Sequence, residues 1–197
     1  MIVKRFPSKF PFVATAALAV LLIHAPSVPA DESDVWNTLA QGGHVALIRH
    51  GNAPPGYGGD PPGFRIDNCK TQRNMDDKGR AQSKALGEAF REHGVRVDRV
   101  AASPVCRCQE TAQLMAVGSV ETSWALIPNN AANQRRSQQL KEMVSSWKGP
   151  GTLVLVSHGE AIKPLVGFMP MQAEIVVLKP EPGSSGGGTL VGTIGPK

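Results

Sequence analysis

The chain is poor in aromatic residues, which make up 5% of its 197 positions, and it has a single tyrosine and three cysteines. After residue 30, the only consecutive basic residues are Arg135 and Arg136. Proteins that bind nucleic acids usually combine basic clusters with aromatic side chains that stack on bases. Nucleic acid is therefore not an expected partner.

Long apolar runs are also missing, since the longest one, residues 12–23, is too short to cross a membrane. Three basic residues precede it: Lys4, Arg5 and Lys9. Val28-Pro29-Ala30 follows it with the small-residue pattern of a cleavage site. This arrangement predicts a secretory signal peptide over residues 1–30, cleaved after Ala30. We expect a periplasmic or secreted protein that has no membrane span after cleavage.

Loss of this leader would lower the formal net charge from +5 to +2, so the basic character of the whole chain carries little information about partners. Residues 31–197 are long enough for one domain with a full core and short for two. Export places the three cysteines in an oxidising compartment, where disulfides persist. Cys106 and Cys108 are too close for an easy bridge, so we expect Cys69 to pair with one of them. Three cysteines in this spacing match no standard zinc site.

Predicted helices and strands alternate along the chain. The expected strands are residues 44–48, 97–102, 120–123, 153–156, 174–178 and 189–194. The expected helices are residues 34–41, 76–92, 103–115, 133–147 and 161–168. This order predicts an α/β fold, a three-layer α/β/α sandwich with a mostly parallel sheet. The last two strands are candidates for an antiparallel edge pair, and the Gly- and Pro-rich loop over residues 52–64 is expected to shape specificity.

Two of these strands end in histidine followed by glycine. Arg49-His50-Gly51 follows the first strand, and Ser157-His158-Gly159 follows the strand over residues 153–156. Ligands of open α/β sheets bind beyond the carboxyl ends of the strands, so both imidazoles are expected at the same edge. Ser103 is expected to cap the helix that follows residues 97–102, with Arg107 in its first turn. Two arginines, two histidines and a helix N-terminus suit a tetrahedral dianion.

The chain resembles the histidine phosphatase superfamily, also called phosphoglycerate mutase-like, over nearly all of residues 31–197. Four motifs in order carry the resemblance: residues 47–51, 73–82, 103–112 and 157–159. It implies a phosphoglycerate mutase-like fold in which His50 is the nucleophile. It also implies that Arg49, Arg107 and His158 bind the phosphate and that no metal or other cofactor is required. Arg73 and Ser103 are further candidates for substrate binding.

The proton donor is less clearly indicated. Mutase-type relatives carry a glutamate between the second arginine and the second histidine, but residues 124–133 contain no acid. The acid-phosphatase branch has an aspartate directly after its second histidine, where this chain has Gly159. Glu160 is the first candidate, although it suits a helix-capping role equally well, and Asp67 is the second. The short interval between Arg107 and His158 favours a phosphatase over a mutase.

The sequence thus predicts an exported phosphomonoesterase that works through a phosphohistidine on His50. Its expected partner is a small phosphorylated substrate, such as a cell-envelope phosphosugar or another organic phosphate outside the cytoplasm. The alternative is a non-catalytic protein on the same fold that binds phosphate or a phosphosugar. The physiological substrate and the oligomeric state stay open.

Overall fold

The computed structural model describes residues 1–2, 31–55, 59–128 and 134–197. Apart from Met1 and Ile2, the expected signal peptide therefore lies outside the described residues. The helices are α1 (Glu32–Ala40), α2 (Asp77–Glu92), α3 (Cys106–Met115), α4 (Gln134–Ser145) and α5 (Gly159–Val166), with short 3₁₀ turns η1 (Cys69–Thr71) and η2 (Trp124–Leu126). The strands are β1 (Val45–Arg49), β2 (Val97–Ala102), β3 (Val120–Thr122), β4 (Thr152–Ser157), β5 (Ile175–Pro180) and β6 (Gly188–Ile194).

The strands form one mixed sheet in the order β3-β2-β4-β1-β5-β6. The first four strands in this order run parallel, whereas β5 is antiparallel to both of its neighbours. Because β4 lies between β2 and β1, the carboxyl ends of these three strands are adjacent. His50 follows β1 and His158 follows β4, so both lie at this edge of the sheet, as the sequence predicted.

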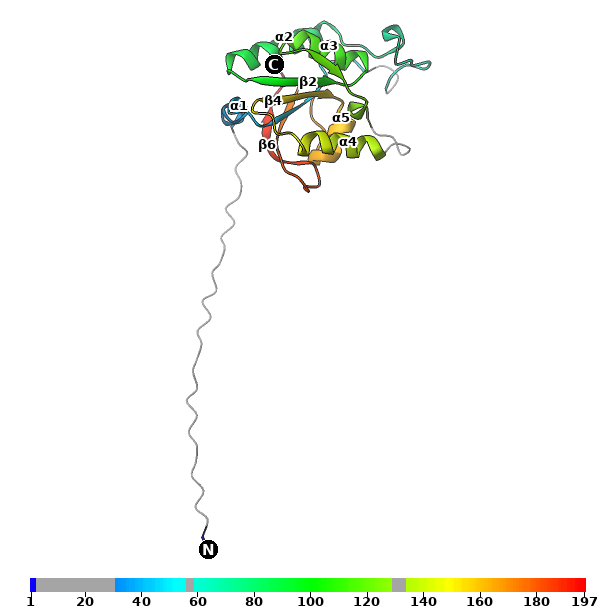
Figure 1. Ribbon diagram of the computed structural model, residues 1–197. Coiled ribbons are helices and arrows are strands. Elements are labelled where there is room, and N and C mark those ends of the chain that lie inside the picture. The colour runs from blue at the N-terminus through cyan, green and yellow to red at the C-terminus, as the bar shows by residue number, and fades with distance from the viewer. Residues whose placement is uncertain (3–30, 56–58, 129–133) are drawn as a thin grey trace.

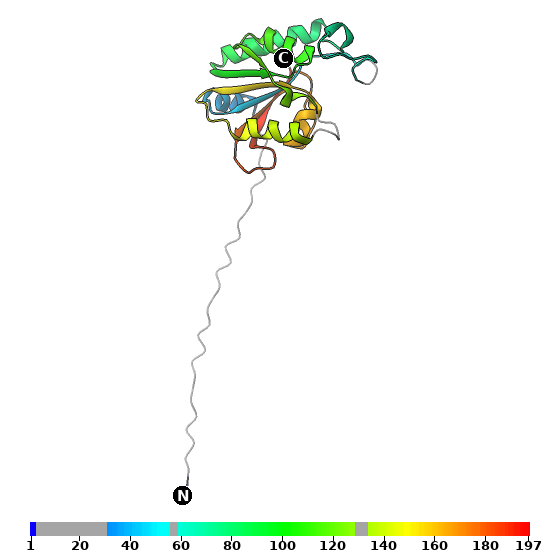
Figure 2. The same ribbon diagram turned by 45° about the vertical axis from the view of Figure 1, so that its right-hand side comes forward.

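Helices cover both faces of the sheet, as Figures 1 and 2 show, with α2 and α3 on one side and α4 and α5 on the other. On the first side, α1 joins α2 and α3, and Trp36, Leu86 and Met115 pack on strand residues such as Val154. On the second side the core contains these helical residues: Leu140, Val144, Ile162 and Leu165. All six residues of β4 are buried because helices lie on both of its faces. The predicted three-layer sandwich is confirmed.

The predicted elements agree with the structure to within a few residues. The C-terminal strands form an antiparallel pair with β6 at the edge, as expected. The predicted start of one helix is wrong. Helix α3 begins at Cys106 with Val105 at its N-cap, so Ser103 does not cap it. None of the helices within the described ranges combines the length and apolar character needed to span a membrane.

Candidate functional site

His50 and His158 lie side by side because they follow neighbouring parallel strands in matching register. Arg49 of β1 pairs with Ser157 of β4, and the backbone N–H of His50 donates to the carbonyl of Ser157 at 3.0 Å. The ring centroids of the two histidines are 5.4 Å apart. The sheet register therefore brings together the two imidazoles that the sequence predicted.

The tautomer of His50 follows from its hydrogen bond. Its Nδ1 lies 2.8 Å from the carbonyl oxygen of Gly51, which can only accept, so Nδ1 carries the proton. The lone pair is then on Nε2. Burial, the charge of Arg107 and the charges of Arg49 and Arg73 lower the pKa of His50 to about 3, despite its bond to Gly51. His50 is therefore a neutral imidazole with a free lone pair throughout the physiological range.

His158 has the opposite tautomer. Its Nδ1 lies 3.2 Å from Nη2 of Arg107, and a guanidinium can only donate, so Nδ1 accepts. Nε2–H then donates to the Ser103 hydroxyl at 3.0 Å. Burial lowers the pKa of His158 well below its usual value, and the charge of Arg107 adds to the effect. His158 is thus fixed between one arginine and one buried hydroxyl.

Two glycines let the segment after β1 approach α2. A Cβ on Gly51 would lie 2.5 Å from the carbonyl oxygen of Gly79, and one on Gly79 would lie 2.2 Å from the carbonyl oxygen of Asn52. Asp76 fixes the same contact, since it caps α2 through the N–H of Gly79 and accepts from Asn52 Nδ2 at 2.7 Å. The motif over residues 73–82 therefore sets the position of His50 by close packing.

A cavity of about 360 Å³ opens near the ends of β1 and β4; neither histidine lines it, but Arg107, which does, contacts His158. Three arginines line it: Arg49, Arg73 and Arg107. The Nε–H groups of all three are buried and have no hydrogen-bond partner among the described residues. Buried donors are almost always paired, so three of them around one cavity indicate an anion site. Bidentate binding by guanidinium groups suits phosphate oxygens.

Asp60 also lines this cavity, and it was not among the residues predicted from the sequence. Its Oδ1 accepts from Nη1 of Arg107 at 2.8 Å and from the backbone N–H of Arg73 at 3.0 Å. Burial alone would raise the pKa of Asp60, but these hydrogen bonds and the charges of both arginines outweigh it and lower the pKa. Asp60 is the only acid in the loop over residues 52–64. That loop was expected to shape specificity, but no residue pattern linked its acid to Arg107.

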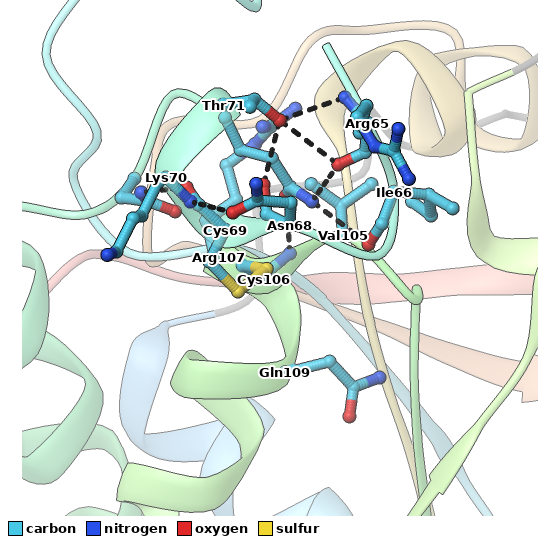
Figure 3. Close-up of a disulfide and its surroundings, with 12 residues drawn as sticks. Arg65, Ile66, Asn68, Cys69, Lys70, Thr71, Val105, Cys106, Arg107 and Gln109 are labelled. Atoms are coloured by element: carbon cyan, nitrogen blue, oxygen red, sulfur yellow. Dashed lines mark hydrogen bonds between the residues drawn. A yellow bond between two sulfur atoms is a disulfide. The ribbon is translucent and has the colours of Figure 1, made fainter.

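A disulfide joins the loop before α2 to the start of α3. Cys69 and Cys106 are bonded, which resolves the choice that the sequence left open, and Cys108 is a buried thiol. Figure 3 shows the disulfide beside Arg107. Gln72 adds a second link, since its Oε1 accepts from the N–H of Cys106 at 2.9 Å. Burial raises the pKa of Cys108 to about 12, so its thiol is not a nucleophile at neutral pH.

The remaining candidates predicted from the sequence are Glu160, Asp67 and Ser103, and they lie in different surroundings. Glu160 lines the cavity from the first turn of α5 and is exposed. Asp67 is exposed on the surface, paired with Arg65 at 2.9 Å, and does not line the cavity. Ser103 is fully buried against His158, so it positions that ring and does not line the cavity. The N–H of Cys106 at the start of α3 is already bound to Gln72, so side chains form the anion site.

Arg49 approaches the cavity from the end of β1, and its Nη1 donates to the carbonyl of Pro170 at 2.8 Å. Gly159 packs against Met169: a Cβ there would lie 2.2 Å from Sδ of Met169, whereas its 3.4 Å distance from Arg49 would be an ordinary contact. A side chain at position 159 would therefore require Met169 to move. Within the described ranges, no group of three or more His, Cys, Asp or Glu side chains is arranged to hold a metal ion.

The sequence matches a known family and several curated proteins over part of its length. Residues 45–126 match the histidine phosphatase superfamily (branch 1). Among curated proteins, the mitochondrial serine/threonine-protein phosphatase Pgam5 of Drosophila virilis is 33% identical over 72 residues, or 36% of this chain. The Pgam5 of Drosophila mojavensis is 32% identical over the same length. Each match spans only 22% of the relative's own length.

Solved structures with the same fold cover more of the chain. The protein histidine phosphatase SixA, complexed with tungstate, aligns with 77% of this chain and 96% of its own at 21% identity, with a TM-score of 0.54. The phosphoserine phosphatase of Entamoeba histolytica aligns with 76% of this chain and 95% of its own at 16% identity, also with a TM-score of 0.54. Residues 45–126 thus match the histidine phosphatase superfamily in sequence, and the described chain has the fold of its phosphoglycerate mutase-like members.

Proposed function

We propose that this protein is a member of the histidine phosphatase superfamily that hydrolyses phosphomonoesters through a phosphohistidine on His50. One observation carries the proposal: a neutral His50 with its lone pair on Nε2 is close enough to three arginines for their charges to lower its pKa, and the buried Nε–H groups of these arginines have no partner in the described chain. A protein that only bound phosphate would have no use for that lone pair.

The site suits a two-step transfer. Nε2 of His50 attacks phosphorus and the ester oxygen leaves, which gives a phosphohistidine. Water then attacks phosphorus and releases phosphate, and the electron pair of the phosphorus–nitrogen bond returns to Nε2. Arg49, Arg73 and Arg107 offset the negative charge of the phosphoryl oxygens in both steps. His158 fixes the orientation of Arg107, because its Nδ1 accepts from that guanidinium.

The site of action is part of the proposal. The leader-like residues 1–30 and the disulfide between Cys69 and Cys106 both support an exported protein, since disulfides persist outside the cytoplasm. A periplasmic or secreted enzyme would meet small organic phosphates or phosphosugars of the cell envelope. The relatives named above act on phosphoproteins or phosphoserine, and their substrates are not assigned to this chain.

A turnover assay tests the proposal. Purified residues 31–197 should hydrolyse 4-nitrophenyl phosphate, and His50→Ala should lose at least about a thousandfold in kcat/KM while its circular dichroism and Tm stay unchanged. Wild-type activity in the folded His50→Ala variant would contradict the phosphohistidine route. Binding of inorganic phosphate without turnover between about pH 4 and pH 8 would favour the non-catalytic alternative.

A further inference from the structure

Asp60 accepts hydrogen bonds from both Nη atoms of Arg107, the nitrogens that could donate to a phosphate. The guanidinium has five N–H groups, of which four are on the two Nη atoms. Nη1 contacts Asp60 Oδ1 at 2.8 Å and the carbonyl of Arg73 at 3.3 Å. Nη2 contacts Asp60 Oδ2 at 3.3 Å and His158 Nδ1 at 3.2 Å. All four Nη–H groups are therefore taken, and only the Nε–H lacks a partner in the described residues.

A phosphate that binds Arg107 through Nη1 and Nη2 would displace this carboxylate, because the two oxygens of Asp60 occupy these same nitrogens. The exchange is physically reasonable. The Asp60 side chain is 25% exposed and lies on a loop, whereas that of Arg107 is 6% exposed and lies on α3. The carboxylate is thus the less buried of the two partners and can move away more easily than the guanidinium.

The displaced carboxylate stays near the ester. The backbone N–H of Arg73 also binds Asp60, and Gly59, Asp60 and Arg73 all line the cavity. Among the described acids, only Asp60 and Glu160 line it. Glu160 is exposed in the first turn of α5 and makes no hydrogen bond with the three arginines, whereas Asp60 is within hydrogen-bond distance of two of them.

We propose that Asp60 is the proton donor and acceptor of the reaction, released from Arg107 when the phosphate of the substrate takes its place. This inference rests on the proposed function and names a residue that the family motifs in this chain do not contain. It assigns to Asp60, which precedes the motif over residues 73–82, a direct part in catalysis.

Over one proposed catalytic cycle the enzyme neither gains nor loses a proton. The substrate enters as a monoanion and gives its proton to the Asp60 carboxylate as the dianion binds the arginines. Nε2 of His50 then attacks phosphorus while Asp60 protonates the leaving oxygen, which departs as an alcohol. Asp60, again a carboxylate, takes a proton from the attacking water and transfers it to the departing phosphate. His50 recovers its lone pair, and the enzyme returns to its starting state.

Substrates whose leaving groups differ in acidity test whether Asp60 is the proton donor. A 4-nitrophenolate leaves without a proton, whereas the alkoxide of glycerol phosphate needs one. Asp60→Asn should therefore lose about a hundredfold or more in kcat/KM on glycerol phosphate and less than about fivefold on 4-nitrophenyl phosphate. Asp67→Asn is the matched control, since it makes the same change in an exposed acid outside the cavity, and it should leave both values unchanged. Equal losses on both substrates in Asp60→Asn would overturn the proposal.

Two further measurements test the exchange at Arg107 and the choice of Asp60 over Glu160. Removal of the competing carboxylate should tighten the binding of inorganic phosphate to Asp60→Asn by severalfold, measured by calorimetry, and weaker binding would overturn the exchange. Glu160→Gln should show no dependence on the leaving group, so a dependence there would transfer the role to Glu160. If His50→Ala is inactive while Asp60→Asn shows no such dependence, the proposed function stands and only the role of Asp60 fails.

Discussion

Arg107 and His158 hold each other in the site, with Nη2 of Arg107 3.2 Å from Nδ1 of His158. They come from α3 and from the end of β4, and both are almost fully buried. The contact fixes the imidazole tautomer and the orientation of the guanidinium together. A substrate phosphate would then meet donors that are already arranged, which is the usual source of electrostatic catalysis.

Replacement of the guanidinium should therefore be costly even when the charge stays. Arg107→Lys keeps one positive charge but loses the planar donor pair, so we expect kcat/KM on 4-nitrophenyl phosphate to fall by about 100-fold or more. Arg99→Lys is a control, because Arg99 is exposed and binds Glu121 outside the phosphate cavity. A loss of less than about threefold in Arg107→Lys would contradict the role of the fixed guanidinium.

Alanine substitutions at two glycines of α2, Gly79 and Gly87, should lower stability similarly but differ in their effect on activity. A Cβ at Gly79 would meet the backbone of Asn52 at 2.2 Å, and a Cβ at Gly87 would meet the backbone of Met115 at 1.9 Å. Both alanine variants should be less stable by about 1–3 kcal/mol, measured by urea unfolding. Only Gly79→Ala should also lower kcat per folded molecule, because it moves the segment that carries His50. Equal kcat values in the two variants would contradict this placement.

Part of the site could be predicted because the parallel strands determine it. Buried apolar runs before His50 and His158 indicate neighbouring parallel strands, and their carboxyl ends must share one edge of the sheet. The pairing of Cys69 was open between Cys106 and Cys108, because the spacing does not show which side of a helix faces the loop. The helix start at Ser103 was predicted wrongly, because Ser-Pro is typical of an N-cap but the Ser103 hydroxyl binds His158 instead.

Asp60 could not be predicted for a different reason. It lies in a loop without periodicity, 47 positions before Arg107, and the two are brought together by tertiary packing around the disulfide and Gln72. Candidates chosen by motif, Glu160 and Asp67, are near the motifs in sequence, but sequence proximity does not give contact. Asp67 instead forms a surface ion pair with Arg65.

The disulfide should stabilise both the fold and the site. It closes a loop with a sequence separation of 37, which corresponds to about 4 kcal/mol in the chain-entropy description. Cys69→Ser and the double variant Cys69→Ser/Cys106→Ser should lose similar free energy of unfolding and about tenfold in kcat/KM, since the loop that carries Gln72 and Asp60 is then less constrained. Unchanged activity in both variants would show that the disulfide does not order the site.

Stability should fall in acid because of the buried histidines. The folded pKa of His50 is about 3 against 6.5 for the free side chain, so the unfolded chain binds a proton that the folded chain does not between these values. The free energy of unfolding should therefore decrease below about pH 6.5, by about 1.4 kcal/mol per pH unit for each such histidine. Urea unfolding between pH 7 and pH 5 measures it, and His50→Gln should have the smaller slope. An equal slope in this variant would contradict a neutral buried His50.

The covalent intermediate is the most direct test of the mechanism. Mixing the wild-type protein with ³²P-labelled substrate and quenching in alkali within one turnover should leave label on the protein. That label should be stable to base, labile to acid and located on the peptide that contains His50. His50→Ala should retain none. Rapid turnover without labelled protein at any quench time, or label that maps to another residue, would contradict a phosphohistidine at His50.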